Sequence, residues 1–207
     1  RTEEIAESGF EILSKLQTFN TDYFPKPEGR PMTMIGGRHF PMVTMELCEY
    51  VDGENVREKC VSLKEIIPGT EQDTGLTTKF PSFWNKEAFF NFIDDMVNAV
   101  RLMHKSEVIH RDLKPSNILL KKPSGSDAIK PFLLDFNISV RSGSGSCSGG
   151  TENYLPPEVR SEKRKDARPA DDLWAVSVII WEMMFGLKQN ISLGLRPHEF
   201  IRFDFPD

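Results

Sequence analysis

The sequence lacks several features that would assign it to a particular class of protein. It has no apolar run near the length of about 18 residues that a membrane-spanning helix needs, so we expect no membrane segment. Cysteine is scarce, at three residues in 207, and its spacing matches no metal site, which favours a reducing, cytoplasmic setting. A net charge of -5 gives no general attraction to nucleic acid, and we expect no nucleic-acid partner.

The composition that remains is that of an ordinary folded protein. Hydrophobic residues make up 39% and charged residues 28% of the chain, which excludes an intrinsically disordered sequence. The length is sufficient for a sizeable core. The first residue is Arg1 and not Met, so we expect a piece of a longer protein. The oligomeric state stays open.

The most informative stretch is His-Arg-Asp-Leu-Lys-Pro-Ser-Asn at residues 110–117, which precedes an apolar run at 118–120. Asp112 and Asn117 lie five positions apart, a spacing that suits neither one strand face nor one helix face. Pro115 removes a backbone donor and discourages helix around Lys114. We therefore predict a shaped loop ahead of a short buried strand, where functional side chains commonly gather.

This loop resembles the catalytic loop of the protein kinases, and three further stretches resemble kinase motifs in the same order. Leu-Leu-Asp-Phe-Asn at 133–137 is similar to the Asp-Phe-Gly metal turn, with Asn in place of Gly. Gly-Thr-Glu-Asn-Tyr-Leu-Pro-Pro-Glu at 150–158 is similar to the end of the activation segment, and 172–182 to the buried central helix of the large lobe. The resemblance implies a eukaryotic-type Ser/Thr protein kinase catalytic domain.

The fold implied by this resemblance is α+β and protein-kinase-like, with a mainly helical large lobe and a partial small-lobe sheet and helix. Residues 1–48 would be part of the small lobe up to the hinge, and residues 49–207 a large lobe that is truncated at its C-terminus. Apolar residues at helical spacing predict a first helix over 3–19, namely Ile5, Ile12, Leu13, Leu16 and Phe19. The same pattern predicts helices from Lys86 to about 103 and over 170–185. Strands are expected over 40–48, 118–120 and 131–134, an insertion over 52–84, and a Gly/Ser-rich stretch over 142–150.

Four residues carry the chemistry that the resemblance implies. Asp112 would accept the proton of the substrate hydroxyl as it attacks the γ-phosphate of ATP, and Lys114 would place a cation against the transferring phosphate. Asn117 and Asp135 would hold Mg²⁺ through oxygen ligands, which this hard cation prefers. The implied partner is a protein substrate with a Ser/Thr acceptor, because Lys114 matches the Ser/Thr branch of the family.

Further residues take supporting roles under the same resemblance. Those placed around the nucleotide are Met45 as gatekeeper, Glu46 and Cys48 in the hinge, and Leu119. In the activation segment, Thr151 would lie beside Asp112 and Lys114, and Arg111 would pair with a phosphate on one of four candidate acceptors, Ser142, Ser144, Ser146 or Ser148. Structural roles fall to His110 and Phe136 in packing, Asp172 in bonding the backbone of the catalytic loop, and Glu158. In the family Glu158 pairs with an Arg from a later helix, which the chain does not contain.

The sequence departs from the kinase pattern in three respects. It contains no Gly-x-Gly-x-x-Gly loop and no Val-Ala-x-Lys strand. The helix position of the usual ion-pair Glu falls on Gly9. The metal turn has Asn137, a residue that tolerates left-handed backbone better than other non-Gly residues. These departures keep open a pseudokinase that acts as a binding or regulatory scaffold, and a small-molecule kinase of related fold is a third alternative.

Overall fold

The structure, a computed structural model, describes residues 2–19, 22–28, 33–35, 38–40, 44–45, 49–52, 56–59, 61–67, 85–122, 128–143 and 145–185. Its helices are α1 (Thr2–Gln17), α2 (Leu63–Ile66), α3 (Lys86–Lys105), η1 (Pro115–Asn117), η2 (Glu152–Tyr154), α4 (Pro157–Arg160) and α5 (Pro169–Phe185). Its strands are β1 (Pro27–Glu28), β2 (Thr33–Ile35), β3 (Arg38–Phe40), β4 (Thr44–Met45), β5 (Glu49–Asp52), β6 (Val56–Lys59), β7 (Val61–Ser62), β8 (Val108–Ile109), β9 (Ile118–Lys121), β10 (Lys130–Leu133) and β11 (Val140–Arg141).

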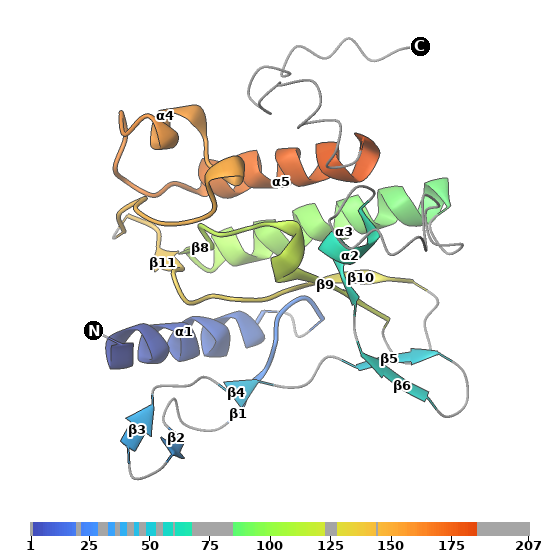
Figure 1. Cartoon of the computed structure of the whole chain (residues 1–207), viewed down its shortest axis with the longest axis horizontal. Coiled ribbons are helices and arrows are strands. Elements are labelled where there is room, and N and C mark those ends of the chain that lie inside the picture. The colour runs from blue at the N-terminus through green and yellow to red at the C-terminus, as the bar shows by residue number, and fades with distance from the viewer. Residues whose placement is uncertain are drawn as a thin grey trace.

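The three long helices share one hydrophobic core, in which α3 lies between α1 and α5 (Figure 1). The α1 side chains in this core are Ile12, Leu13 and Leu16, and α5 contributes Ala175, Val176, Ile179 and Met183. Buried residues of the loop and strands between them, Leu113 and Ile118, belong to the same core. None of the helices in the described parts of the chain combines the length and apolarity that crossing a bilayer requires.

The sequence of α3 explains both its start and its buried face. The side chain of Asn85 accepts a hydrogen bond from the backbone N–H of Ala88 at 2.8 Å and so caps the first turn. Apolar residues then recur three and four positions apart, which places them on one face of the helix. That face is buried and consists of Phe92, Met96, Ala99, Val100 and Met103. Because this face packs in the core, strand β8 and the loop that follow α3 begin in the interior of the molecule.

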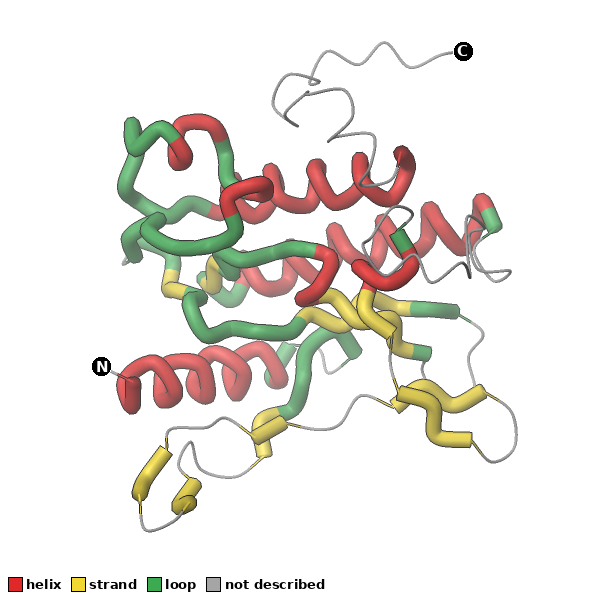
Figure 2. Tube along the Cα trace, in the orientation of Figure 1, coloured by secondary structure: helices red, strands yellow, loops and turns green. Residues whose placement is uncertain are grey.

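Short antiparallel strands position the loops between α3 and α5. Strand β9 lies between β10 and β7, and Leu133 of β10 is paired with Ile118 of β9. Strand β8 pairs with β11. Because β9 and β10 are consecutive antiparallel strands, the loop that ends at Asn117 and the loop that begins at Leu134 lie at the same end of this pair (Figure 2).

Most of the predicted elements that fall on described residues are confirmed. The helices expected over 3–19, from Lys86 and over 170–185 are α1, α3 and α5, and the two strands after Asn117 are β9 and β10. Phe19 is a wrong assignment: it lies beyond the end of α1 and is 50% exposed. Residues 41–43, 46–48, 68–84 and 186–207 lie outside the described residues. The division between lobes at residue 48 stays a prediction.

Candidate active site

The loop at 110–117 begins where β8 ends, and one buried carboxylate of α5 fixes its backbone. The Asp172 side chain, 1% exposed, accepts hydrogen bonds from the backbone N–H groups of His110 and Arg111, both at 2.9 Å. His104, in the last turn of α3, adds a third contact of 2.8 Å between its Nε2 and Asp172. Since a carboxylate only accepts, that nitrogen carries the hydrogen. The contacts of Asp172 agree with the sequence-based expectation, whereas no motif or spacing had pointed to His104.

The turn at Arg111 is tight and fits against a glycine of the activation segment. Arg111 has a positive φ of 72°, a conformation that non-Gly residues rarely adopt. Its carbonyl faces Gly150, where an added Cβ would lie 2.6 Å from that oxygen. Gly150 itself has φ +92°. Only glycine meets both requirements, and the close approach brings the next residue, Thr151, against the loop.

Asp112, Lys114 and Thr151 form a closed group of hydrogen bonds. Lys114 Nζ donates to Asp112 Oδ2 at 2.6 Å and to the Thr151 hydroxyl oxygen at 3.0 Å. The Thr151 hydroxyl in turn donates to Asp112 Oδ1 at 2.7 Å. Burial alone would raise the pKa of Asp112, but the hydrogen bonds from Lys114 and Thr151 and the charge of Lys114 outweigh it, and the pKa falls below its usual value. Asp112 is therefore an ionised acceptor at neutral pH.

Asn117 is oriented toward Asp112 by the short helix η1. Its side-chain Nδ2 donates to the backbone oxygen of Asp112 at 2.9 Å and to Oδ2 of the same residue at 3.3 Å. Because the amide nitrogen is used in this way, the amide oxygen is the atom left for a ligand. The backbone N–H of Leu134 donates to the Asn117 carbonyl at 2.8 Å, so Asp135 follows directly at the same end of the β9–β10 pair.

Asn117 and Asp135 are the two residues of this site that could offer oxygen ligands to a magnesium ion. Within the described residues no three His, Cys, Asp or Glu side chains converge to hold a metal ion. Mg²⁺ usually keeps several waters and binds through one or two carboxylates together with substrate phosphates, so an amide oxygen and a carboxylate suit it. In this turn Asp135 adopts the left-handed conformation, with φ 62°. Asn137 does not adopt a positive φ, so the tolerance of asparagine for left-handed backbone is not called upon at this position.

His110 and Phe136 lie in the interior, which agrees with the packing roles expected of them. Their ring centroids are 4.8 Å apart, and Phe136 meets Phe24 edge to face at 6.1 Å. His110 Nε2 donates to the carbonyl of Leu134 at 2.9 Å, which assigns the hydrogen to that nitrogen. Burial lowers the pKa of His110, so the ring is neutral. The contact of His110 with Phe136 thus joins the start of the loop to the turn at Asp135, and Phe24 packs on the Phe136 ring.

The activation segment is held to the loop through the Arg111 side chain. Its Nη1 donates to the carbonyl of Ile138 at 2.8 Å, and its Nη2 to the carbonyl of Ser148. Among the candidate phosphate acceptors, Ser142, Ser146 and Ser148 are exposed, and Ser144 lies outside the described residues. The Arg111 side chain therefore binds the backbone at two points of the segment, Ile138 and Ser148.

The end of the activation segment makes two contacts that the sequence did not reveal, one with α5 and one with the loop that follows α4. The Tyr154 hydroxyl donates to Glu182 Oε2 at 2.8 Å, and Glu182 is buried. Burial raises the pKa of Glu182 to about 7. Glu158, expected to lack its partner in this chain, instead lies 3.6 Å from a guanidinium nitrogen of Arg164, in the loop that follows α4. Residues 6 and 28 positions apart are joined here by the fold, and no sequence spacing announces such pairs.

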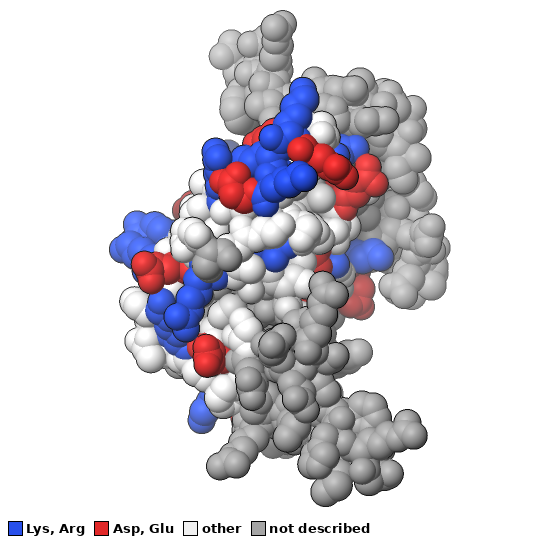
Figure 3. All heavy atoms as spheres, turned by 90° about the vertical axis from the view of Figure 1, so that its left-hand side faces the viewer, with Lys and Arg blue, Asp and Glu red and all other residues white. Residues whose placement is uncertain are grey.

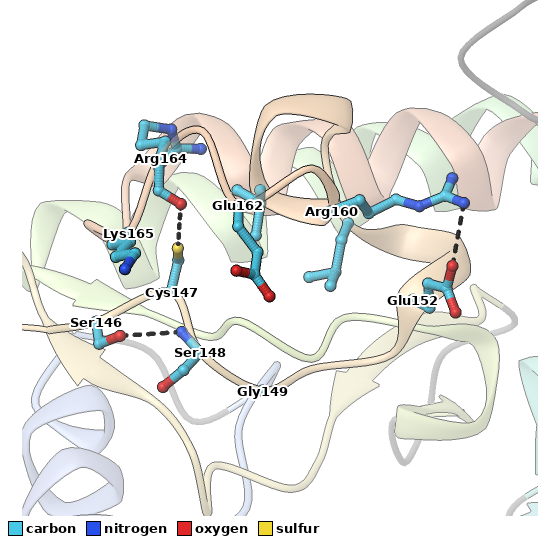
Figure 4. A pocket seen from close by; sticks show the side chains of 11 residues that line it. Ser146, Cys147, Ser148, Gly149, Glu152, Arg160, Glu162, Arg164 and Lys165 are labelled. Carbon is cyan, nitrogen blue, oxygen red and sulfur yellow. Dashed lines mark hydrogen bonds and ion pairs between the residues drawn. The ribbon is translucent and has the colours of Figure 1, made fainter.

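A pocket of about 490 Å³ opens between the activation segment and α4 (Figure 4). Ser148 and Gly149 line one side, and Leu155 and Val159 supply its apolar part. Lys165 lies beside Cys147 at one edge of it (Figure 4). Because Gly149 is two residues from Thr151, the pocket adjoins the hydrogen-bonded group around Asp112.

The residues predicted around a nucleotide are only partly described. Met45 is described through its backbone in β4, which pairs with β1. Glu46 and Cys48 lie outside the described residues. Leu119 is half-buried on β9 and packs with Leu134 against Phe132. The nucleotide contacts of these residues therefore stay predictions.

Comparison with known proteins gives consistent results. The family model described as the protein kinase domain matches residues 44–191. Aurora kinase of Schizosaccharomyces pombe is 40% identical over 106 residues, which cover 50% of this chain and 28% of that protein. Calcium/calmodulin-dependent protein kinase type 1 of Macrobrachium nipponense is 33% identical over 132 residues, covering 63% of this chain and 36% of that protein. Human serine/threonine-protein kinase ULK1 is 33% identical over 102 residues, covering 46% and 10%.

A solved structure shares the fold. The kinase PK-1 of the Cydia pomonella granulovirus aligns with a TM-score of 0.58 over 86% of this chain and 54% of that chain, at 20% sequence identity. The matches thus cover between about a tenth and about half of the length of these proteins. The α+β fold is protein-kinase-like.

Proposed function

The chain belongs to the protein kinase domain family, and from that premise we propose that the protein transfers the γ-phosphate of ATP to a serine or threonine hydroxyl of a protein substrate. The observation that carries the proposal is the closed group of Asp112, Lys114 and Thr151. Phosphoryl transfer asks mainly for positioning and charge neutralisation. This group brings a carboxylate, a cation and a hydroxyl together at one point.

Asp112 would orient the acceptor hydroxyl and take its proton. Its lowered pKa keeps it ionised at neutral pH, and it need not be a strong base because the transition state is loose. Lys114 Nζ lies 2.6 Å from Asp112 Oδ2. When ATP is bound, this ammonium group would turn from Asp112 toward the transferring phosphate and place its positive charge against it. Thr151 holds the other oxygen and so fixes the plane of the carboxylate.

Asn117 and Asp135 would hold Mg²⁺, and the orientation of the Asn117 amide supports this role. When bound, the ion supplies charge neutralisation at the phosphates. Met45, Glu46, Cys48 and Leu119 would surround the adenine. The family assignment supports ATP and Mg²⁺ only in general terms.

Serine and threonine acceptors are favoured by Lys114 and Thr151. Both side chains contact Asp112, the arrangement that the Ser/Thr branch uses. One of the relatives is named as a serine/threonine-protein kinase. Phosphorylation of one of the candidate serines is the proposed means of regulation, and a phosphate on Ser148, whose carbonyl accepts from Arg111, would lie close to that guanidinium.

The test is transfer by the full-length protein. Incubated with Mg-ATP and a generic basic protein, it is expected to yield phosphoserine or phosphothreonine. Asp112→Asn should abolish that product, whereas Asp94→Asn, an exposed change of the same kind on α3, should not. Transfer that persists in Asp112→Asn contradicts the role given to Asp112.

A scaffold without transferase activity is the second candidate, and Gly9 favours it. This residue is buried in α1 and offers no carboxylate where the family has an ion-pair Glu. A thermal-shift titration of the full-length protein separates the two functions. Mg-dependent stabilisation by nucleotide supports the kinase, and its absence supports the scaffold.

A further inference from the structure

The loop between α4 and α5 carries four basic residues, and one of them, Arg164, lies largely buried in a network of contacts. Figure 3 shows basic and acidic side chains mixed over the end of the molecule where this loop lies. Arg168 and Asp166 form an exposed pair, with side chains 58% and 56% accessible. Arg164 differs because its side chain is 10% exposed and its partner Asp171 is 9% exposed. Because both side chains are largely buried, the Arg164–Asp171 pair is less screened by solvent than the exposed pair Arg168–Asp166.

The guanidinium of Arg164 joins three parts of the chain. Nη1 donates to Asp171 Oδ2 at 3.2 Å and Nη2 to Oδ1, so the carboxylate is held at both oxygens. The same Nη2 lies 3.6 Å from Glu158 Oε1, at the end of the activation segment. Nη1 also donates to the carbonyl of Asp166. The hydrogen bonds to Asp171, together with the charges of Asp171, Glu158 and Asp166, raise the pKa of Arg164.

The backbone around Arg164 pairs with the other end of the activation segment. The Cys147 N–H donates to the Lys165 carbonyl at 2.7 Å, and the Cys147 thiol to the Arg164 carbonyl at 3.0 Å. The Ala167 N–H donates to the Gly145 carbonyl at 3.0 Å. Thr151 therefore lies within a stretch whose two ends, near Cys147 and Glu158, are both attached at Arg164.

Asp171 is the neighbour of Asp172, whose carboxylate binds the backbone of His110 and Arg111. The start of α5 thus holds the catalytic loop through one aspartate and the activation segment through the next. Arg164 is the link on the second path. Between these two attachments the Thr151 hydroxyl donates to Asp112 Oδ1 at 2.7 Å.

We propose that Arg164 is a positioning residue, which sets the activation segment against the catalytic loop by joining Glu158 to Asp171 through its guanidinium, next to the point where its own carbonyl accepts from the Cys147 thiol. The inference rests on the proposed kinase function. It requires arginine because a planar fork can serve two carboxylates and a carbonyl at once, whereas a lysine presents a single charge point. Glu158 accordingly finds its arginine within the same segment of the chain.

The test compares three variants of the full-length protein, Arg164→Gln, Arg164→Lys and the matched control Arg168→Gln. We expect Arg164→Gln to lower kcat for the protein substrate roughly 10- to 100-fold, the range caused by a misplacement of about 1 Å. The stoichiometry and affinity of nucleotide binding should stay within about twofold, which shows that the folded fraction is unchanged. Arg164→Lys should recover only part of the loss, and Arg168→Gln should stay within about twofold of wild type.

Hydrogen exchange provides a readout that does not need activity. Amides of residues 145–158 should exchange faster in Arg164→Gln than in Arg168→Gln, while those of α3 stay protected in both. If wild type transfers no phosphate, the proposed function fails and exchange alone decides the role of Arg164. Equal exchange in the two variants, or full rescue of kcat by lysine, overturns the inference. If Arg164→Gln does not fold, adding Asp171→Asn removes the unpaired carboxylate and allows the same comparison.

Discussion

At the scale of single residues, Thr151 provides a hydroxyl that touches both charged side chains of the catalytic loop. It donates to Asp112 and accepts from Lys114. Hydrogen bonds that involve a charged partner are worth more than neutral ones, about 1.5–3 kcal/mol each. A residue that is neither acid nor base is therefore expected to matter for transfer.

Replacing Thr151 tests that expectation. Thr151→Ala should lower kcat for protein phosphorylation about 10- to 100-fold, because the carboxylate of Asp112 loses the hydrogen bond that fixes its plane. Thr151→Ser keeps the hydroxyl and should stay within about threefold of wild type. Steady-state kinetics with a peptide acceptor measures both. Equal losses in the two variants would show that the methyl group, and not the hydroxyl, is what counts.

Glu182 makes the stability of the protein depend on pH. Its pKa is about 7 in the folded protein against an ordinary 4.5, because burial disfavours the charged form. The folded state thus holds this proton more tightly than the unfolded state. The stabilisation is complete below about pH 4.5 and is lost as the pH rises to about 7, a change of roughly 3 kcal/mol.

Urea denaturation at several pH values checks this dependence. Relative to Glu182→Gln, the unfolding free energy of wild type should fall between about pH 4.5 and pH 7 and level off above it. Because the hydrogen bond from Tyr154 lowers the pKa of Glu182, Tyr154→Phe should move the upper limit to higher pH. Parallel curves for wild type and Glu182→Gln would place the titration elsewhere.

At the scale of elements, the approach of the activation segment to the catalytic loop depends on glycine geometry. Gly150 has a positive φ and faces the carbonyl of Arg111, whereas Gly143 has a positive φ and nothing within 4 Å of the place a Cβ would take. The two positions share the conformational requirement and differ in the space available. The pair thus separates the cost of conformation from the cost of contact.

We expect Gly150→Ala to destabilise the protein by at least about 1 kcal/mol more than Gly143→Ala. The added methyl group must push Arg111 or the segment itself away, and Thr151 moves with it. Thermal denaturation of the two variants gives the difference in stability. Identical midpoints would mean that the segment adjusts without cost.

The elements that could be predicted are those whose signal lies within one stretch of sequence. Helices α3 and α5 follow from their apolar spacing, and the β9–β10 pair from two apolar runs around a polar tip. Phe19 was assigned wrongly because it continues the spacing past the point where the helix ends. Helix periodicity says which face a residue would take, and not where the helix stops.

The site was predictable for the side chains within motifs and not for the contacts between distant segments. Asp112, Lys114 and Thr151 were singled out and lie together. The contacts of His104 with Asp172 and of Arg164 with Asp171 were not foreseen, since the first depends on how α3 packs against α5 and the second on how the loop after α4 closes over the start of α5. An isolated charged residue in a loop carries no sign of the partner that folding will bring to it.

At the scale of the whole molecule, one core runs from α1 through α3 to α5. A residue of α1 in that core should therefore affect the stability of the entire described body. Leu16 is fully buried, while Phe19 is half exposed only three positions later. The two positions form a matched pair within one stretch of the chain.

Leu16→Ala should lower the free energy of unfolding by about 2–5 kcal/mol, because a cavity is left in the shared core. Phe19→Ala should change it by less than about 0.5 kcal/mol. Circular dichroism and tryptophan fluorescence should report the same transition for Leu16→Ala. An early separate loss of helix signal would show that α1 unfolds independently of α5, where two of the tryptophans lie.

The carboxylate of Asp172 receives three hydrogen-bond donors, from His104, His110 and Arg111, with two oxygens. An asparagine amide has the same shape but only one acceptor oxygen. Its NH₂ group would face one of these N–H groups, so that two donors would meet with no acceptor between them. Asparagine is thus no neutral substitute here, although it differs from aspartate by a single group. A change at this position would leave a backbone N–H at the turn of His110 and Arg111 without its acceptor, so the shape of the turn depends on a side chain about 60 residues away in the chain.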